Sequence, residues 1–398
     1  MTRTILHLDL DAFFCAVEEG LNPKLRGQTF AVGGKADARG VVASCSYPAR
    51  RMGVHSAMPM SQAVRLCPGL IVVPPHFKEY STASHKVMAL LGEITPLLEQ
   101  ISIDEAFMDV TPQAGEALAR RLQRQINEEL HLPCSFGVAT NKLVAKIANN
   151  VGKDRAKAHP DAANTTPNAI TVVLPGTEAA FLAPLGIREL WGVGPKTAER
   201  MRGLGIRTIG DLARWNDSDL VYMFGKNGGE MAQRARGLDD RPVAPEQDTK
   251  SISRETTFTR DVNDMTLLRQ TIRQLAEGVG WRTRKAALRG NTIRVKIRWS
   301  DFTTLTRQQA LAQATDDDAV IEGIAQDLFR AAWTPGQAVR LIGVGISGFD
   351  DAEQQLALWQ DEASEEKRKL QETLDDLRSR FGESIVKRGS DLNGRKKS

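Results

Sequence analysis

Two apolar segments of this chain carry acidic residues that a plain buried strand would not accommodate. The run Ile5–Leu10 is too apolar for an exposed edge strand, yet Asp9 lies near its end. A second pair, Asp104 and Glu105, interrupts the apolar stretch that continues to Val110. Because a partly buried carboxylate needs a cation or hydrogen-bond donors, these positions constrain the fold. If the two strands are neighbours, three carboxylates converge at one end of a sheet.

Three carboxylates at one sheet end would repel one another unless cations lie between them. Oxygen ligands suit Mg²⁺, which keeps open positions for phosphate oxygens. Two such ions can activate a hydroxyl group and stabilise a departing pyrophosphate. Each acid taken alone is also compatible with a helix cap or a solvated surface group, so spacing by itself leaves both interpretations open.

The hydrophobic pattern predicts a multidomain α/β protein. The segment Ile101–Ile103 is expected to form a hairpin with Phe107–Val110, with Asp104 and Glu105 at its tip. Glycine-punctuated short helices follow, then a polar, proline-containing linker, and then two strand-helix-strand halves. The strands expected in the first part are 5–10, 29–32, 40–44, 71–73, 100–103, 106–110 and 134–139, and the helices 115–130 and 142–149. Those of the second α/β unit are strands 291–299, 304–312 and 339–348 and helices 267–283 and 319–332, followed by a charged helix at 362–381.

Composition excludes several classes of protein. The 398 residues are 41% hydrophobic and 26% charged, which is typical of globular domains. No apolar run of about 18 residues occurs, so a membrane span is not expected. The four cysteines lie far apart, so neither a disulfide framework nor a zinc module is indicated. A cytoplasmic protein without a membrane partner is expected.

Positive charge is concentrated in one segment. Between Lys250 and Ala310 basic residues outnumber acidic ones by eight, against a net charge of +4 for the whole chain. This segment is a candidate polyanion surface, and a merely solvated face is the alternative. Within it, Arg294, Lys296 and Arg298 alternate along one predicted strand and therefore share a sheet face.

A proline marks a possible phosphate site. Pro48 is expected at the first position of a helix, with Tyr47 as its cap and Arg50 in its first turn. Helix N-termini attract phosphate, and an arginine adds a bidentate donor. Solvated surface is the alternative for Arg50.

Four motifs in order resemble those of Y-family translesion DNA polymerases, closest to the bacterial DNA polymerase IV branch. They are Leu8–Glu18, Tyr47–Arg50, Ser102–Asp109 and Ser135–Lys142, within a match that spans roughly residues 4 to 349. The resemblance implies a right-handed polymerase with a ferredoxin-like palm, small fingers, a helical thumb and an α/β little finger, without a proofreading domain. The implied boundaries are palm 1–11 and 77–166, fingers 12–76, thumb 167–236, linker 237–249, little finger 250–349 and tail 350–398.

The resemblance also implies roles for individual residues at the active site. Asp9, Asp104 and Glu105 would be catalytic and bind two Mg²⁺ ions, with Mn²⁺ as a possible substitute and the Leu10 carbonyl as a further ligand. Phe14 matches the steric gate against ribonucleotides, although Phe13 also fits a substrate contact or a plain core position. Small residues at Ala43, Ser56 and Ala57 match the roof over the nascent base pair.

Three residues match the family's binders of the deoxynucleoside triphosphate, namely Tyr47, Arg50 and Lys153. The last departs from the family's Lys-Pro-X-Gly pattern, because Asp154-Arg155-Ala156 follows it. Arg155 or Lys157 therefore remain alternatives for the same role.

Further positions match DNA-binding and partner-binding elements of the family. Gly192, Gly194 and Lys196 lie in a predicted helix-hairpin-helix, where glycines let backbone amides approach a DNA phosphate. A simple glycine-bearing turn is the alternative. Gln355-Leu356-Ala357-Leu358-Trp359 resembles the pentapeptide that binds the sliding clamp, the beta subunit, with tryptophan in place of the usual phenylalanine.

The sequence therefore predicts a monomeric, metal-dependent DNA polymerase of low fidelity that extends primer-template DNA past damaged bases. A non-catalytic DNA-binding relative is an alternative, but it would have lost the carboxylates, which are all present. A nucleotide cyclase on a similar palm is a second alternative, which would leave the helix-hairpin-helix and the basic segment unexplained.

Overall fold

The computed structural model describes residues 2–158, 166–246, 248–349 and 362–382. These fall into two compact units, 1–247 and 248–398. The division lies inside the predicted linker 237–249. Each unit is described by itself.

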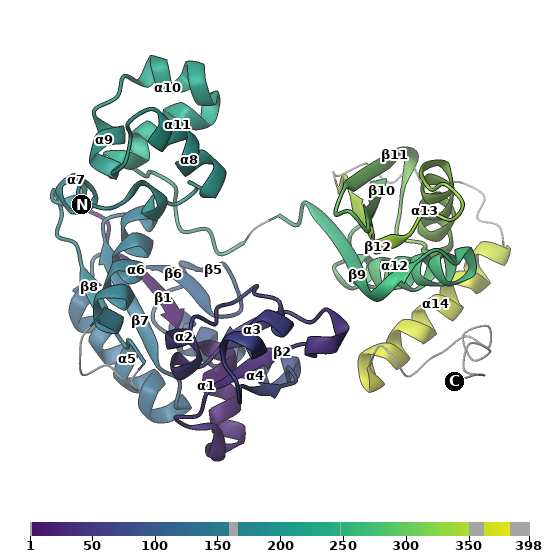
Figure 1. Ribbon diagram of the computed structural model, residues 1–398, viewed down its shortest axis with the longest axis horizontal. Coiled ribbons are helices and arrows are strands. Elements are labelled where there is room, and N and C mark those ends of the chain that lie inside the picture. Colours follow the sequence, from purple (N-terminus) through teal and green to yellow (C-terminus); the bar gives the residue numbers. More distant parts are fainter. Residues whose placement is uncertain (1, 159–165, 247, 350–361, 383–398) are drawn as a thin grey trace. The chain divides into compact units, whose positions relative to one another are not determined.

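The first unit is built on a five-stranded sheet in the order β5-β6-β1-β7-β8 (Figure 1). The strand β1 pairs antiparallel with both β6 and β7, so the predicted neighbourhood of the two acid-bearing strands is confirmed. The strands are β1 (Ile5–Leu10), β5 (Leu98–Gln100), β6 (Glu105–Asp109), β7 (Cys134–Ala139) and β8 (Ile170–Val172).

Helices cover both faces of this sheet. Leu6, Leu8 and Leu10 pack into the core beneath α4 (Phe77–Gly92) and α5 (Gly115–Leu130). Because strand side chains alternate, Ile5, His7 and Asp9 face the other way, toward α6 (Lys142–Ala158). Alternation along β1 therefore gives one purely apolar face and one face with the polar side chains of His7 and Asp9.

Close contact between α6 and the sheet depends on Gly137. This residue lies on β7 opposite His7, and a Cβ there would collide with the carbonyl oxygen of Ala145. The helix can consequently approach near enough for its side chains to reach the end of β1.

Several predicted boundaries in this unit were wrong. The strand expected at 100–103 ends at Gln100, and residues 101–104 form the turn, so Glu105 is already the first residue of β6. The helix expected at 142–149 continues to Ala158, because its apolar face stays in contact with the sheet. The strand β8, within the predicted thumb, pairs with β7 and so belongs to the five-stranded sheet.

A smaller three-stranded sheet, in the order β3-β2-β4, has a core of its own. Its strands are β2 (Phe30–Gly33), β3 (Val42–Cys45) and β4 (Ile71–Val73), close to the predicted positions. Around it lie α1 (Phe13–Leu21), α2 (Tyr47–Arg51), α3 (Met60–Leu66) and the short 3-10 helices Pro23–Leu25 and Ala36–Ala38.

The predicted run of short helices is confirmed. It contains the 3-10 helix Ile187–Glu189, α7 (Glu178–Leu182), α8 (Pro195–Gly203), α9 (Ile209–Ala213), α10 (Asp217–Phe224) and α11 (Lys226–Ala235). The glycines between them shorten each helix, and the apolar residues of the set join those of α6 in one core.

The first part of the predicted linker is folded against this unit. Asp239 accepts a hydrogen bond of 3.0 Å from the backbone N–H of Leu143, and Ala244 donates through its N–H to Glu99 at 2.9 Å. Glu99 also forms a buried ion pair with Lys142 at 2.7 Å. Residues 239–244 are therefore part of the folded unit.

We expect Glu99→Ala to destabilise the first unit by about 3–5 kcal/mol, because the Lys142 ammonium would stay buried without its partner. Chemical denaturation of the full chain, followed by circular dichroism, measures this effect. Glu116→Ala is the matched control, since the Glu116–Arg120 pair is exposed and is expected to contribute only about 0–1 kcal/mol. Equal effects of the two variants would contradict the prediction.

The second unit is a four-stranded antiparallel sheet, β11-β10-β12-β9, with helices packed on one face. Two strand-helix-strand halves build it, as predicted. They are β9 (Ser251–Val262), α12 (Met265–Lys285) and β10 (Gly290–Trp299), then β11 (Thr304–Thr315), α13 (Asp318–Ala332) and β12 (Val339–Ser347).

The helix α14 (Glu362–Phe381) has the predicted bounds and packs against the helices of this unit. The Arg284 guanidinium binds Asp318 at 2.9 Å and Asp375 of α14 at 2.6 Å. Gln371 donates to Asp318 at 2.9 Å, and Arg378 lies 3.4 Å from Glu277. Polar contacts thus hold α14 on α12 and α13.

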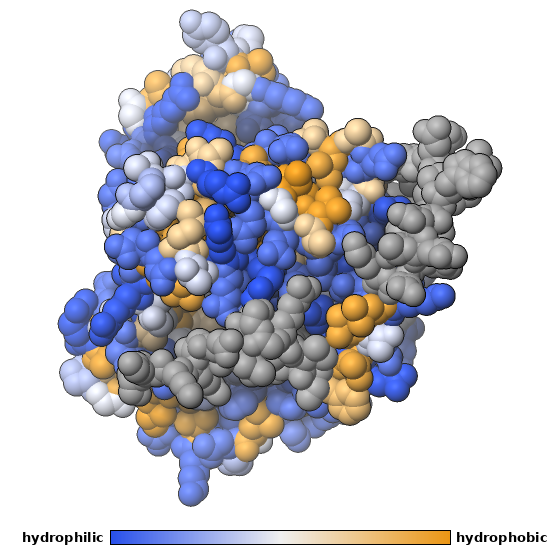
Figure 2. Space-filling model, turned by 90° about the vertical axis from the view of Figure 1, so that its right-hand side faces the viewer, coloured by the Kyte–Doolittle hydropathy of each residue, from blue (hydrophilic) through white to orange (hydrophobic). Residues whose placement is uncertain are grey.

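None of the described helices is long and apolar enough to cross a membrane. The face shown in Figure 2 is mostly hydrophilic, with apolar residues in small separate groups. All four cysteines are free and buried.

Candidate active site

The predicted acidic cluster forms at one end of the first sheet. Asp9 on β1 lies directly opposite Glu105 on β6, and the carbonyl oxygen of Asp104 accepts a 2.9 Å hydrogen bond from the N–H of Leu10. The Asp104 side chain is half-buried and accepts a hydrogen bond of 2.5 Å from Ser102. Strand pairing therefore brings all three acids together.

A row of polar residues on α6 faces this cluster. Lys146, Asn149 and Lys153 follow one another at intervals of three and four residues, which places them on one side of the helix. The Lys146 ammonium binds Glu105, and the Lys153 ammonium binds Asp9. Lys153 also lies 2.9 Å from Asp11. The helix thus supplies the cations that the partly buried carboxylates require.

Hydrogen bonds define the proton position on His7. This side chain is fully buried, and its Nδ1 accepts a 3.0 Å hydrogen bond from the Asn149 amide. The proton of the neutral ring therefore lies on Nε2, which donates to Glu105. His7, which Asn149 holds in place, therefore orients the Glu105 carboxylate.

Burial and charge move the pKa values of these groups in different directions. Burial lowers the pKa of His7 to about 4, so the ring is neutral at pH 7. Burial also raises the pKa of Asp9 to about 6, against the opposing effect of Lys153. For Glu105, burial raises the pKa, but the hydrogen bonds from His7 and Lys146 and the charge of Lys146 outweigh burial and lower the pKa to about 2.

Asp11 is a structural neighbour of the cluster. It is completely buried and accepts hydrogen bonds from Ser135 at 2.7 Å and from the N–H of Asn168 at 2.9 Å, in addition to its contact with Lys153. Its carboxylate therefore connects β1 to β7 and to the segment that precedes β8.

The donor set fits a hard divalent cation. Asp9, Asp104, Glu105 and the backbone carbonyl of Leu10 offer oxygen atoms only, as Mg²⁺ prefers. Among the residues that the structure describes, no three His, Cys, Asp or Glu side chains are grouped closely enough to hold a metal ion. Asp9 and Glu105 each face a lysine instead.

The predicted cap of α2 was wrong. Ser46, and not Tyr47, caps this helix, because the Ser46 hydroxyl accepts from the N–H of Ala49 at 3.4 Å. Pro48 follows as the second residue of the helix. Tyr47 is the first residue of the helix, and its ring lies 4.9 Å from the Arg50 guanidinium. Burial, with the nearby charges of Asp11 and Asp9, raises the pKa of the Tyr47 hydroxyl, so this hydroxyl remains a donor beside the acidic cluster.

The two phenylalanines of α1 have different environments. Phe13 is only 2% exposed and belongs to the core, which favours the plain core position over the predicted substrate contact. Phe14 is half-buried, and its ring stacks on Tyr80 with centroids 4.2 Å apart. Only Phe14 keeps a surface that a substrate could contact.

Lys153 and the two alternatives for its role, Arg155 and Lys157, have different environments. Asp154 forms an ion pair with Lys157 at 2.8 Å and leaves Lys153 to the acidic cluster. Arg155 is exposed. The substitution of the usual proline by Asp154 therefore does not draw Lys153 away from the site.

The predicted helix-hairpin-helix has the expected local geometry. Gly192 has a φ of 98°, which favours glycine, and Gly194 is the residue before α8. Gly192, Gly194 and Lys196 are all exposed. The turn before α8 therefore carries two exposed glycines and an exposed lysine.

Basic residues of the second unit lie both on its sheet and on its helices. Arg294, Lys296 and Arg298 share the sheet face away from the helices, because Ile293, Val295 and Ile297 fill the core between them. Lys296 is paired with Glu255 at 2.8 Å. Basic charge on this face is therefore smaller than the sequence suggests.

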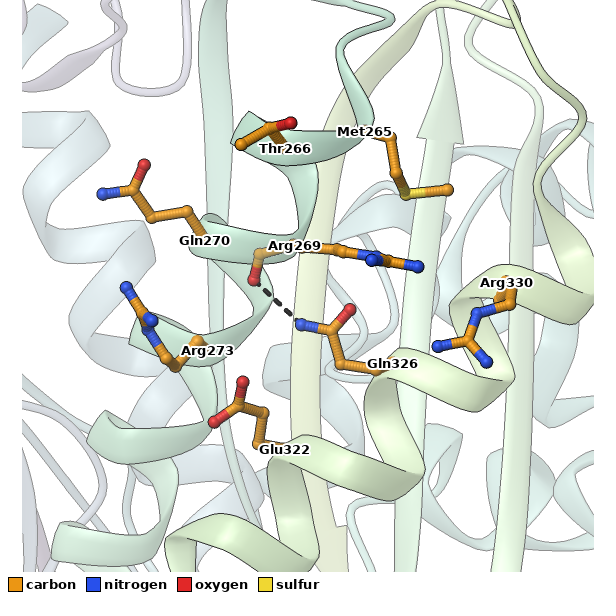
Figure 3. Close-up of a pocket in the computed structure, with 8 residues that line it drawn as sticks. All are labelled: Met265, Thr266, Arg269, Gln270, Arg273, Glu322, Gln326 and Arg330. Carbon is orange, nitrogen blue, oxygen red and sulfur yellow. Dashed lines mark hydrogen bonds between the residues drawn. The ribbon is translucent and has the colours of Figure 1, made fainter. Parts of the chain in front are cut away.

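A second group of arginines lies on the helices of this unit (Figure 3). A cavity of about 490 Å³ opens between α12 and α13, where the Gln326 amide donates to the carbonyl oxygen of Arg269 at 3.0 Å. Its lining residues are Met265, Thr266, Arg269, Gln270, Arg273, Glu322, Gln326 and Arg330. The basic segment is thus divided between the sheet and the helices.

The predicted clamp-binding residues Gln355, Leu356, Leu358 and Trp359 lie outside the described residues. The site residues that sequence reasoning missed are His7, Lys146, Asn149 and Asp11. The spacing of Lys142, Lys146, Asn149 and Lys153 could have revealed the row on α6, had the helix been predicted to its full length.

Comparisons with known proteins agree with this architecture. Residues 8–150 match the impB/mucB/samB family, residues 249–358 match its C-terminal domain, and residues 175–206 match its HHH motif. The DNA polymerase IV of Desulfatibacillum aliphaticivorans is 42% identical over 96% of this chain and 95% of its own length. That of Streptomyces coelicolor is 41% identical over 88% of this chain and 72% of its own length.

Solved structures show the same fold. A chimera of the Y-family DNA polymerases Dbh and Dpo4 has a TM-score of 0.77 and 28% identity, and covers 87% of this chain and 99% of its own. An insertion ternary complex of the Dbh DNA polymerase has a TM-score of 0.60 and 27% identity, over 87% of this chain and 99% of its own. The chain belongs to the impB/mucB/samB family of Y-family DNA polymerases. It is a DNA-directed DNA polymerase, and its curated relatives named above are DNA polymerase IV enzymes.

Proposed function

We propose that this polymerase performs translesion synthesis of low fidelity, using two divalent metal ions and no proofreading. The observation that carries the proposal is the direct opposition of Asp9 and Glu105, with Asp104 beside them, at one end of the sheet. Such a donor set matches the metal requirement of nucleotidyl transfer.

Asp9, Asp104 and Glu105 would hold the ions, with the Leu10 carbonyl as a further ligand. Mg²⁺ is the expected metal, and Mn²⁺ is a substitute with the same preference for oxygen. When bound, the ions activate the primer 3′-hydroxyl and stabilise the departing pyrophosphate. His7 and Asn149 support this by orienting Glu105.

The remaining residues of the first unit would bind the incoming deoxynucleoside triphosphate. Tyr47 and Arg50 are donors on the side of α2, and Lys153 is a donor on the side of α6, so phosphate oxygens would be bound from both sides. Phe14 would lie beneath the deoxyribose and exclude a 2′-hydroxyl. Ala43, Ser56 and Ala57 are exposed and small, which is compatible with a roof that tolerates a damaged base.

Primer extension on a template with one abasic site tests the translesion role. We expect full-length product past the abasic site and frequent misincorporation on undamaged template. A product that stops one nucleotide before the lesion under conditions that copy undamaged DNA would contradict the proposal.

We infer that Gly192, Gly194, Lys196, Arg294, Lys296 and Arg298 bind the DNA backbone. Each phosphate neutralised contributes about 0.9 to the slope of log affinity against log salt. We expect the double variant Arg294→Gln/Arg298→Gln to flatten this slope by about 1.8. Adding Lys296→Gln should change it less, because Glu255 already compensates the charge of Lys296.

Fluorescence anisotropy of labelled primer-template DNA over a series of salt concentrations measures the slope. Arg269→Gln/Arg330→Gln, on the helices, removes the same charge and is expected to leave the slope unchanged. Equal slopes for the two double variants would contradict the proposed DNA contact and show that the sheet face is an ordinary solvated surface.

The chain is proposed to act as a monomer that a sliding clamp, the beta subunit, tethers to DNA through Gln355, Leu356, Leu358 and Trp359. Tethering raises the effective concentration of the polymerase at the primer end without new contacts to DNA. We expect deletion of residues 355–359 to abolish stimulation by the clamp and to leave single-nucleotide insertion unaltered. Product length with and without clamp measures the effect, and clamp-dependent lengthening after the deletion would place the docking site elsewhere.

A further inference from the structure

The aromatic ring of Phe14 stacks on Tyr80, a ring that is itself held in place. Its ring stacks on Tyr80 of α4, with an interplanar angle of 12° and centroids 4.2 Å apart. Phe77 meets both rings edge-on, at 6.2 Å from Phe14 and 5.9 Å from Tyr80. The position of Phe14 therefore depends on the position of Tyr80.

Tyr80 in turn is held by a buried carboxylate. Its side chain is fully buried, and its hydroxyl donates to Oε1 of Glu18 on α1. The same oxygen lies 2.8 Å from Nδ1 of His76, the residue that precedes α4. Since a carboxylate only accepts hydrogen bonds, His76 donates through Nδ1.

Core packing alone does not explain an acid at this place. Glu18 is 2% exposed, and burying a carboxylate is unfavourable unless donors satisfy it. A leucine would fill the same space on α1 without that requirement. Glu18 lies four residues after Phe14, so both side chains project from the same side of α1. Helix α1 thus carries both Phe14, whose ring is stacked on Tyr80, and Glu18, which holds the Tyr80 hydroxyl.

We propose that Glu18 is a positioning residue for sugar discrimination, acting on Phe14 through the hydroxyl of Tyr80. The carboxylate fixes the rotation and depth of the Tyr80 ring, and the stack transmits this position to Phe14. His76 completes the anchor from the N-terminal end of α4. The inference rests on the proposed role of Phe14 as the steric gate and adds the residues that hold the gate in place.

The test is the ratio of kcat/KM for a deoxynucleotide to kcat/KM for the matching ribonucleotide. We expect Glu18→Leu and Tyr80→Phe each to lower this ratio by about 2- to 30-fold, the range for residues coupled through packing. Tyr80→Phe keeps the ring and tests the hydroxyl alone, should Glu18→Leu fold poorly. Glu18→Gln should keep the parental ratio, because the amide oxygen of glutamine still accepts a hydrogen bond from the Tyr80 hydroxyl.

Glu79→Leu is the matched control, since Glu79 is exposed and adjacent to Tyr80 on α4. It is expected to keep the parental ratio. Thermal unfolding of each variant separates a loss of stability, which moves the melting temperature, from a loss of discrimination, which moves the ratio. An unchanged ratio in both Glu18→Leu and Tyr80→Phe would overturn the inference.

A double variant separates this inference from the role of Phe14 itself. If Glu18 acts only through Phe14, Glu18→Leu has no further effect on the ratio in a Phe14→Ala background. A further loss of equal size there would overturn the inference and leave the steric gate intact. An unchanged ratio in Phe14→Ala alone would instead overturn the gate and, with it, the role of Glu18.

Discussion

Primer extension is expected to disappear in the variant Asp104→Asn, while affinity for primer-template DNA remains within about twofold. The substitution keeps the shape of the side chain and removes one negative charge from the proposed metal site. The loss of rate should be at least about 1000-fold, at the upper end of the effect of removing one charge-stabilising group. DNA affinity is retained because the proposed phosphate contacts lie on other elements.

Single-turnover insertion at saturating Mg²⁺, together with anisotropy on the same DNA, measures both quantities. Glu93→Gln is the matched control, because Glu93 is an exposed acid of the same unit that follows α4. It should keep the parental rate. Turnover by Asp104→Asn within tenfold of the parent would remove Asp104 from the catalytic set.

Ribonucleotide incorporation is expected to rise sharply in Phe14→Ala. The ring that would meet the 2′-hydroxyl is lost, and the selectivity for deoxynucleotides should fall by about 100-fold or more, equivalent to about 2.7 kcal/mol. Tyr80 would remain beneath the vacated position, because Glu18 still holds its hydroxyl.

Steady-state kcat/KM for each sugar measures this selectivity. Phe13→Ala is the informative comparison, since Phe13 is a core residue and its truncation should cost about 3–5 kcal/mol of stability without a comparable change in selectivity. Equal selectivity of Phe14→Ala and the parent would place the gate at another residue.

Local sequence patterns predicted much of the fold. The alternation along β10 correctly assigned Arg294, Lys296 and Arg298 to one sheet face, and the charged pattern predicted the bounds of α14. The hairpin tip was displaced because Ile101 and Ile103 are apolar yet follow the last residue of β5 and lie in the turn. The cap of α2 was misassigned because Ser46 also precedes Pro48, and only the backbone geometry distinguishes it from Tyr47.

The acidic residues, the glycines of the helix-hairpin-helix and the periodicity of each element are local properties, so the sequence by itself determined the candidate metal ligands, the candidate DNA-binding turn and most of the elements. It did not determine which lysine meets which acid. Lys146 reaches Glu105 and Lys153 reaches Asp9 only because Gly137 admits α6 close to the sheet. Likewise, Glu18 supports Tyr80 only because α1 packs against α4. Such pairings depend on close packing between segments far apart in the chain, which only the tertiary structure decided.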